Sequence, residues 1–276
     1  MNIFTRPVHN LFVFFLYPSS QDPMISYLKT LRISREDVRE LRFLLHGPVG
    51  AGKSSIINTV KSIFEGHQFI NCLAAAEVTK SFTFKKFSLE NVPFAMYDVM
   101  GLEDGDTKGV HTEDIINALK GHIADNYEFN PASAMDTKNR YYIHNPTLND
   151  RMHCLVSVIP ADRISLMNDD TIQKMKVIRA AASKLEIPQV LFMTRVDQGC
   201  KLTQNDLGKI YQSKKIRDKC SNRLGVPVRC IFPVKNYSEE NKSDEKLNCL
   251  MLEAFSQIVF DETKLVFVNA NNILGL

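Results

Sequence analysis

Short apolar runs recur along the chain and alternate with segments of helical periodicity. Continuous runs lie at residues 39–45, 92–99, 152–159, 187–193 and 228–234, whereas residues 80–89 alternate phenylalanine with lysine and other polar side chains. Continuous runs of this length are typical of strands that are buried on both faces, as in a parallel sheet. Alternation indicates an edge strand or a hairpin arm. The pattern therefore predicts six strands.

Apolar residues at helical spacing fill most of the intervals between these strands. They predict helices over residues 24–31, 56–64, 112–123, 169–185 and 244–260, and a basic helix or helix pair over residues 203–224. Gly66 is a suitable stop for the second of these helices, Thr112 is expected to cap the third, and Asp169 or Asp170 the fourth. Ser34, with an acidic residue three positions later, also has the form of an N-cap. Strands that alternate with helices predict an α/β fold with a mostly parallel sheet.

The junction between the first strand and the helix at residues 56–64 carries a phosphate-binding motif. Residues 47–54 read GPVGAGKS and match G-x-x-x-x-G-K-[ST] in the strand-to-helix context that this motif requires. Glycines let the backbone curl so that several N–H groups converge on the same oxyanions. Lys53 is expected to bridge the outer phosphates, and Ser54 to hold Mg²⁺ through its hydroxyl. The residues predicted to contact the phosphates of a nucleotide are Gly47, Val49, Gly50, Ala51, Gly52, Lys53 and Ser54.

The strand at residues 92–99 ends in a second motif, D-x-x-G, formed by Asp98 and Gly101. Asp98 is expected to reach Mg²⁺ through a water molecule, and the Gly101 amide to approach the terminal phosphate because no side chain intervenes. The next residue is Leu102, where many fast GTP hydrolases have a glutamine that orients water. Leucine cannot orient water. Hydrolysis is therefore expected to be slow, assisted by a partner, or supplied from elsewhere.

A third motif, Thr194-Arg195-Val196-Asp197, follows the strand at residues 187–193. It matches the base-recognition pattern [NT]-K-x-D except for arginine in place of lysine. A carboxylate accepts hydrogen bonds from the ring N–H and the exocyclic amine of guanine, whereas adenine has an unprotonated ring nitrogen at that position. Asp197 therefore favours guanine, and Arg195 is expected to lie over the base. Lys235, after the last strand, is predicted to border the same base; an adenine-specific ATPase or kinase is the alternative.

Composition narrows the choice of protein class further. The chain has 276 residues, and its 44% hydrophobic and 24% charged content is ordinary for a globular protein with a full core. The formal charge of +3 is too small to indicate a nucleic-acid or anionic-membrane partner. The six cysteines include no C-x-x-C pair, so reduced structural thiols in the cytosol are expected.

The amino terminus contains an apolar run, at residues 11–17, that superficially resembles the core of a signal peptide. The run is too short to span a bilayer, and no A-x-A-like cleavage site follows it. A secretory signal stays an alternative, but an apolar extension that packs or binds a partner is the preferred interpretation. Because nucleotides are abundant in the cytosol, the predicted location is cytoplasmic.

Together these segments resemble the interferon-induced protein 44 and 44-like family. The resemblance runs from about residue 40 to about residue 260 and is carried by LLHGPVGAGKSSIINTVKSIFEGH, YDVMGLEDG, NYEFNP, RMHCLVSVI, MTRVDQ and PVKNYSEE in this order. It implies a GTP-binding domain of the Ras-like P-loop superfamily, with a three-layer α/β/α fold, in a cytoplasmic protein that is induced by interferon and associated with antiviral immunity. The family's phosphate-loop residues carry over to this chain and include Ser55. Longer members have an additional N-terminal domain where this chain has a short, different lead-in.

The sequence thus predicts a lead-in at residues 1–38, a GTP-binding domain at residues 39–260 and a tail at residues 261–276. GTP or GDP with Mg²⁺ is the expected ligand. Lys53 and Thr79 are the predicted catalytic residues, and Ser54, Asp98 and Thr79 the predicted metal ligands, with Thr83 as the alternative to Thr79. The predicted function is slow GTP hydrolysis in the interferon response. The alternative is a non-hydrolysing interaction protein whose loops at residues 102–111 and 124–150 bind unidentified immune-signalling proteins, with nucleotide-dependent self-association as a further expectation.

Overall fold

A six-stranded sheet forms the centre of the computed structural model, which describes residues 22–33, 35–66, 82–105, 107–199, 203, 214–237, 243–257 and 267–269. In chain order the strands are β2 (Leu41–His46), β3 (Lys85–Ser88), β4 (Phe94–Asp98), β5 (Cys154–Pro160), β6 (Gln189–Thr194) and β7 (Ile231–Pro233). Their order across the sheet is β3-β4-β2-β5-β6-β7, and β3 alone runs antiparallel to its neighbour. The predicted mostly parallel six-stranded sheet, with residues 80–89 contributing an edge strand, is confirmed.

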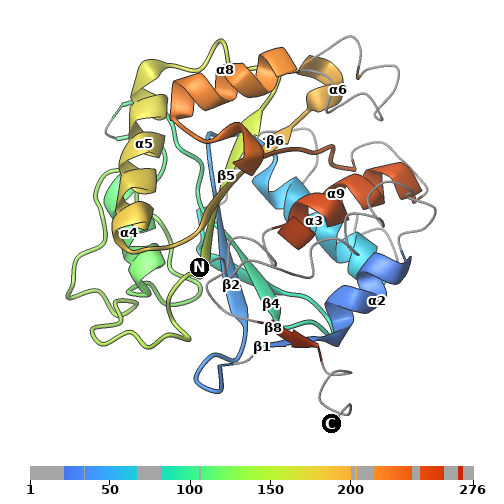
Figure 1. Ribbon diagram of the computed structural model, residues 1–276. Coiled ribbons are helices and arrows are strands. Elements are labelled where there is room, and N and C mark those ends of the chain that lie inside the picture. Colours follow the sequence, from blue (N-terminus) through green and yellow to red (C-terminus); the bar gives the residue numbers. More distant parts are fainter. Residues whose placement is uncertain are drawn as a thin grey trace, which may run out of the picture.

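Helices cover both faces of this sheet and produce three layers (Figure 1). The helices of one face are α4 (Thr112–Lys120), α5 (Asp169–Lys184) and α8 (Lys214–Leu224). The other face carries α2 (Asp22–Thr30), α3 (Lys53–Glu65) and α9 (Glu245–Gln257). A short α6 (Val196–Gly199) follows β6, and a 3-10 turn, η3 (Val228–Cys230), precedes β7. Within these described elements, no helix is both long and apolar enough to cross a membrane.

The strands read as continuous apolar runs because both of their faces are buried. Successive side chains of a strand point to opposite faces. Leu44 therefore joins the core beneath α4 and α5, whereas its neighbours Phe43 and Leu45 join the core beneath α3 and α9. The parallel register of β2 with β5 places Leu44 opposite Leu155, so the same face continues across the sheet. The two cores hold the carboxyl ends of the parallel strands at one edge.

Three predicted N-caps are wrong. His111, not Thr112, precedes the first residue of α4, and it makes no side-chain capping bond. The N-cap of α5 is Asn168, whose side-chain oxygen accepts a hydrogen bond from the amide of Asp170. No helix follows the Ser34 signal, because residues 35–40 form turns in which Asp37 pairs with Arg35 at 2.6 Å. The predicted stop at Gly66 is confirmed, with a left-handed backbone at φ 74°.

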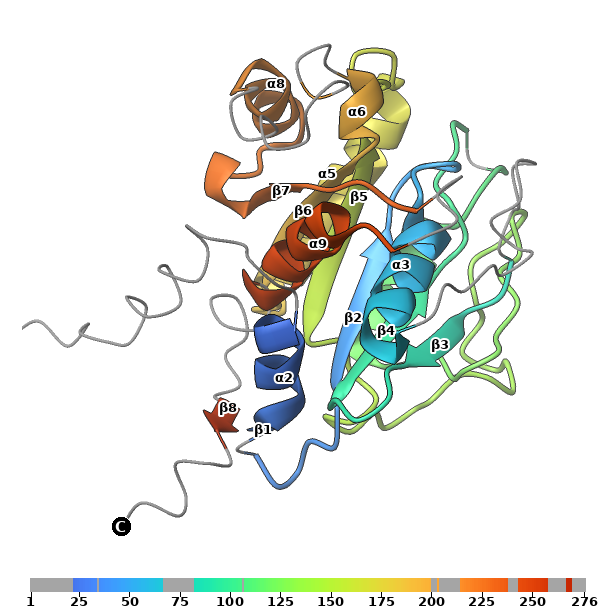
Figure 2. The same cartoon turned by 90° about the vertical axis from the view of Figure 1, so that its right-hand side faces the viewer.

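The lead-in contacts both the tail and the body of the molecule. Leu28 of α2 is 1% exposed and belongs to the same core as α3 and α9. Residues Leu31–Ile33 form strand β1, which pairs antiparallel with β8 (Phe267–Asn269) in a separate two-stranded sheet beside α2 (Figure 2). The sequence pattern did not indicate this sheet. The division into three segments stays a prediction, but α2 packs as part of the central core.

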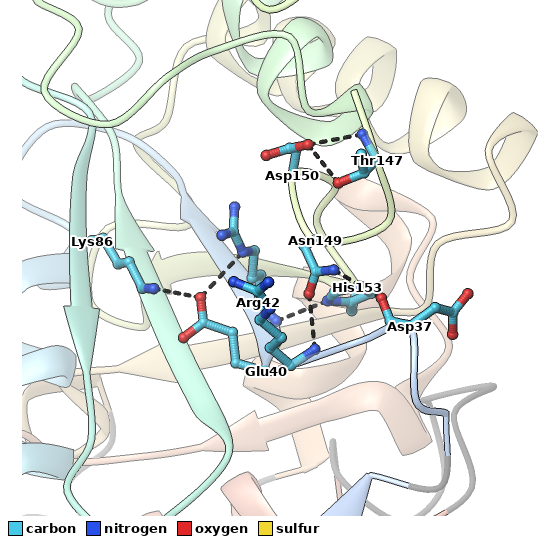
Figure 3. Close-up of polar contacts among 9 residues, drawn as sticks. Asp37, Glu40, Arg42, Lys86, Thr147, Asn149, Asp150 and His153 are labelled. Carbon is cyan, nitrogen blue, oxygen red and sulfur yellow. Dashed lines mark hydrogen bonds and ion pairs between the residues drawn. The ribbon is translucent and has the colours of Figure 1, made fainter. Parts of the chain in front are cut away.

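The long connection at residues 121–153 is packed by its aromatic side chains and anchored at the amino end of β2. Tyr127 and Phe129 are each 4% exposed and join the core beneath α4. The side chain of Asn149 accepts from the amide of Arg39 and donates to the carbonyl of Asp37, and His153 accepts from the amide of Arg42 (Figure 3). These bonds satisfy backbone groups that precede or begin the strand.

Candidate functional site

The phosphate-binding motif forms the tight connection between β2 and α3. A Cβ atom on Gly47 would lie 2.2 Å from the carbonyl oxygen of Val158, so no other residue fits at that position. Gly52 has φ +93°, which disfavours other residues, and a Cβ there would lie 2.9 Å from the Asn236 side chain. The first amides of α3 follow directly after this loop and lack partners within the helix. A helix start of this kind favours anions.

Lys53 and Asp98 are both buried next to this loop, and their charges act on each other. Lys53 is 8% exposed, and its Nζ donates to the Gly47 carbonyl at 3.4 Å. Burial lowers the pKa of Lys53, and the charge of Asp98 opposes that shift. Burial raises the pKa of Asp98, although Lys53 and the Ser54 hydroxyl both act to lower it. Both side chains are therefore held away from water. A bound anion would stabilise the charged form of Lys53, and a bound cation would stabilise the charged form of Asp98.

Ser54 and Asp98 are two of the predicted metal ligands, and the structure brings their side chains together. The Ser54 hydroxyl donates to Asp98 Oδ2 at 2.5 Å. The other oxygen of Asp98, Oδ1, is buried without a hydrogen-bond partner in the described part of the chain. A buried carboxylate oxygen beside a hydroxyl is a donor set that suits a hard divalent cation such as Mg²⁺. These two residues fit the predicted ion.

The D-x-x-G segment lies directly on the phosphate loop. Leu102 is 1% exposed; its amide donates to the Gly47 carbonyl at 3.0 Å, and its carbonyl accepts from the Val49 amide at 3.2 Å. A Cβ on Gly101 would lie 2.5 Å from a methyl group of Val49 and 2.8 Å from its backbone, so glycine is required here. The segment after Asp98 thus adds a short strand-like bridge between Leu102 and Pro48.

The residues predicted to recognise the base lie around the far side of the same loop. The Thr194 hydroxyl donates to the Ala51 carbonyl at 2.7 Å, and Arg195 Nη2 donates to the Gly50 carbonyl at 3.0 Å. Arg195 has a left-handed backbone, with φ 52°, where β6 turns into α6. Asp197 lies in that helix, and its Oδ2 is 3.9 Å from Lys235 Nζ. The ends of β6 and β7 thus meet the loop between β2 and α3.

Two predicted positions are not placed against the loop. Thr79 lies outside the described residues. Thr83 forms an isolated antiparallel bridge with Glu128, in the connection that follows α4. The choice between these threonines stays open. Ser55 lies in the first turn of α3 and is partly buried.

Sequence reasoning missed three side chains that support the site. Asn236 Nδ2 donates to the Gly52 carbonyl at 3.2 Å, one residue after the predicted Lys235. His46 and Ser157 form a buried hydrogen bond of 2.8 Å between β2 and β5, directly before Gly47. The available signal was a polar residue inside an apolar run, as at Ser157, or just after one, as at His46 and Asn236.

These features define the class of protein. A mostly parallel sheet with helices on both faces, a glycine-rich loop between a buried strand and its helix, and an aspartate that meets the loop serine constitute a P-loop α/β fold.

No family model matches the chain. Over 247 residues it is 32% identical to interferon-induced protein 44 of Homo sapiens, an alignment that covers 86% of this chain and 55% of that protein. The mouse protein of the same name (Mus musculus) is 32% identical over 81% of this chain and 55% of its own length. Human interferon-induced protein 44-like is 29% identical over 86% of this chain and 54% of its own length. These matches confirm the resemblance: the chain is a relative of the interferon-induced protein 44 and 44-like proteins.

The chain spans about half the length of these relatives. Among solved structures, it matches translation elongation factor SelB from Methanococcus maripaludis in complex with the GTP analogue GppNHp. That match has a TM-score of 0.39 and 13% identity, and it covers 84% of this chain and 36% of the other. So weak a likeness supports no further conclusion. The fold class rests on the strand order and on the loop.

Proposed function

We propose that this chain binds a guanine nucleotide together with Mg²⁺. The observation that carries the proposal is the meeting of three motifs, far apart in the sequence, around residues 47–54. Asp98 contacts Ser54 through a hydrogen bond, and Thr194 and Arg195 both donate to carbonyls of the loop. In open α/β sheets, ligands bind beyond the carboxyl ends of the strands, which is where these residues lie.

The preference for guanine rests on Asp197. Its carboxylate is partly exposed at the start of α6, with Lys235 nearby. Guanine offers two adjacent donors to such a carboxylate, and adenine offers neither at those positions. Arg195 donates to the Gly50 carbonyl and lies 3.8 Å from Asp162, which directs its head toward the loop and leaves its stem to cover the base.

Bound Mg²⁺ would be held by Ser54 and Asp98, and it would neutralise charge on the phosphates. The hydroxyl of Ser54 would turn from Asp98 to the ion. Lys53 would hold the outer phosphates, because its buried ammonium gains a partner of opposite charge there. Thr79 or Thr83 would supply a further metal ligand and complete the predicted catalytic set.

Hydrolysis of GTP by this chain is proposed to be slow. Leu102 stands where a water-orienting glutamine would be needed, and both its backbone groups are bound to the phosphate loop. The second candidate is therefore a non-hydrolysing protein that uses GTP or GDP as a structural ligand or switch. In either case we propose a role in the interferon-induced antiviral response in the cytoplasm, since the relatives are named as interferon-induced. Its partners would be immune-signalling proteins or further copies of the chain.

A competition titration tests the proposal. Purified chain with Mg²⁺ should bind a fluorescent GTP analogue, and unlabelled GTP or GDP should displace the analogue at far lower concentration than ATP. Tighter binding of ATP would overturn the guanine assignment, and no binding of either nucleotide would overturn the site. Single-turnover hydrolysis then separates the two candidates: a rate no faster than buffer over hours supports the non-hydrolysing protein.

A further inference from the structure

The loop that follows Gly101 is fastened to the first turns of α5 by three side chains. The Thr171 hydroxyl donates to Asp104 at 2.6 Å, and the Gly105 amide donates to Asp170 at 2.9 Å. Lys174 Nζ donates to the carbonyls of Glu103 and Gly105, at 2.9 and 2.7 Å. The partners are separated by 65 to 71 residues in the sequence. We call this set of contacts the α5 clamp.

Lys174 is the centre of the α5 clamp. Its ammonium has three donors. Two serve the carbonyls of Glu103 and Gly105, and the third faces Asp170, 3.2 Å away in the preceding turn. Its side chain is 15% exposed, whereas that of Asp170 is 45% exposed. A charged donor that bridges two carbonyls within one turn of loop restrains the loop backbone more than a single contact would.

The other end of the same loop is joined to the phosphate-binding motif. Leu102 exchanges backbone hydrogen bonds with Gly47 and Val49, and the Gly101 carbonyl accepts from Val110 at 3.1 Å. Gly109, with φ +73°, has room for no Cβ because the Gly101 carbonyl would lie 2.6 Å away. The segment from Gly101 to Gly105 is therefore held at both ends, by the phosphate loop and by α5.

From this geometry we propose that Lys174 is a positioning residue for recognition of the terminal phosphate. It acts through the loop, by keeping the Gly101 amide beside residues 47–49. This inference rests on the proposed function, because it requires that the site take a nucleoside triphosphate. The diphosphate lacks the group that Gly101 would contact, so the α5 clamp should matter for the triphosphate alone.

The test compares affinities for a non-hydrolysable GTP analogue and for GDP, measured with the full chain and Mg²⁺. Lys174→Ala should weaken binding of the analogue roughly five- to twentyfold and leave GDP binding within about twofold, as expected for loss of charge-assisted hydrogen bonds. Lys174→Arg keeps the charge and the donors and should restore most of the difference. Lys176→Ala, on the exposed side of the same helix, is the matched control and should change neither affinity.

Hydrogen exchange at the Leu102 and Gly105 amides provides a second readout. Both should exchange faster in Lys174→Ala than in the unmodified chain. Equal losses for the analogue and GDP, or unchanged binding of both, would overturn the inference while nucleotide binding by the unmodified chain still supported the proposed function. If the unmodified chain bound no nucleotide, the proposed function and this inference would both fall.

Discussion

His46 is buried at the point where β2 enters the phosphate loop, and its environment couples protonation to folding. Its side chain is fully buried and bonded to Ser157, and burial together with the charge of Lys53 lowers its pKa from 6.5 to about 3. The unfolded chain therefore takes up a proton at this histidine at a higher pH than the folded chain. The contribution of neutral His46 is fully present above the unfolded value and is lost as the pH falls toward about 3.

His46→Gln should therefore reduce the acid sensitivity of the fold. Between about pH 7.5 and about pH 4.5, the free energy of unfolding should fall by roughly 2–3 kcal/mol less in the variant than in the unmodified chain. Urea denaturation at the two pH values measures this difference. His144→Gln, at an exposed position, is the control and should leave the pH dependence unchanged. An equal pH dependence in His46→Gln would contradict the assignment.

Lys53 is the side chain on which nucleotide affinity should depend most. Lys53→Ala should weaken nucleotide binding roughly a hundredfold or more, because the buried ammonium is the group expected to bridge the outer phosphates. Since burial of this charge is unfavourable without a ligand, the variant should stay folded. Titration followed by a thermal melt separates these effects. Lys61→Ala, further along α3, should bind normally; an unchanged affinity in Lys53→Ala would refute the phosphate site.

Asp197 should control which base is accepted. Asp197→Asn replaces one acceptor oxygen by a donor, so one of the two bonds to guanine is lost. The ratio of ATP to GTP dissociation constants should fall at least about tenfold, with a smaller loss of total affinity than in Lys53→Ala. Competition titrations give both quantities. A ratio that did not move would mean that the base is recognised elsewhere.

At the scale of elements, α2 supports the central core although the predicted division assigns it to the lead-in at residues 1–38. It precedes the predicted GTP-binding domain, yet Leu28 is buried in the core shared with α3 and α9, and Lys29 donates to the Phe64 carbonyl at 3.4 Å. Pairing of β1 with β8 then ties the chain after α2 to the chain after α9. These contacts make α2 part of the layer that supports α3 and hence the phosphate loop.

Leu28→Ala should accordingly destabilise the whole fold by about 2–4 kcal/mol, the range for removal of a buried leucine. Chemical denaturation followed by circular dichroism gives the change. Ser26→Ala, at an exposed position on the same helix, should have little effect. A cost in Leu28→Ala below about 0.5 kcal/mol, the size of a surface effect, would show that α2 is dispensable.

For the molecule as a whole, the site joins four strand ends that the sheet brings together. The loop follows β2, and Asp98, Thr194 and Lys235 stand at or just after the ends of β4, β6 and β7. A ligand that contacts the loop and these three strand ends would stabilise the packing on both faces of the sheet. Bound Mg²⁺ would give a partner to Asp98 Oδ1, which is buried without a hydrogen bond in the described part of the chain.

GTP with Mg²⁺ should therefore stabilise the entire chain against unfolding. At a free concentration about 100 times the dissociation constant, the gain should be about 2.7 kcal/mol, and ATP at the same concentration should give much less. Urea denaturation with each nucleotide measures the gain. Equal stabilisation by GTP and ATP would contradict recognition of guanine, and omission of Mg²⁺ should reduce the effect.

Much of this architecture could be predicted from local patterns. The central strands could be recognised as apolar runs because both of their faces are buried, whereas the edge strand β3 contains polar side chains because none of its four residues is fully buried. The phosphate loop, Asp98 and Asp197 were found because each combines a short motif with a position at the end of an apolar run. These are the features in which the chemistry of a few neighbouring residues dictates the conformation.

Only the folded chain decided the rest. Asn168 caps α5 because its backbone is extended. Three neighbouring polar residues, Asn168, Asp169 and Asp170, could each cap a helix, and the sequence does not show which of them has that backbone conformation. The α5 clamp, the His46–Ser157 bond and the β1–β8 pair join residues far apart in the sequence, through single polar contacts or very short strands. Such contacts leave no periodic signal, because their energy comes from groups that meet after the sheet has formed. The motifs thus predicted a ligand with phosphates and a guanine base, whereas the tertiary contacts specified how the loop at Gly101 is held against residues 47–49.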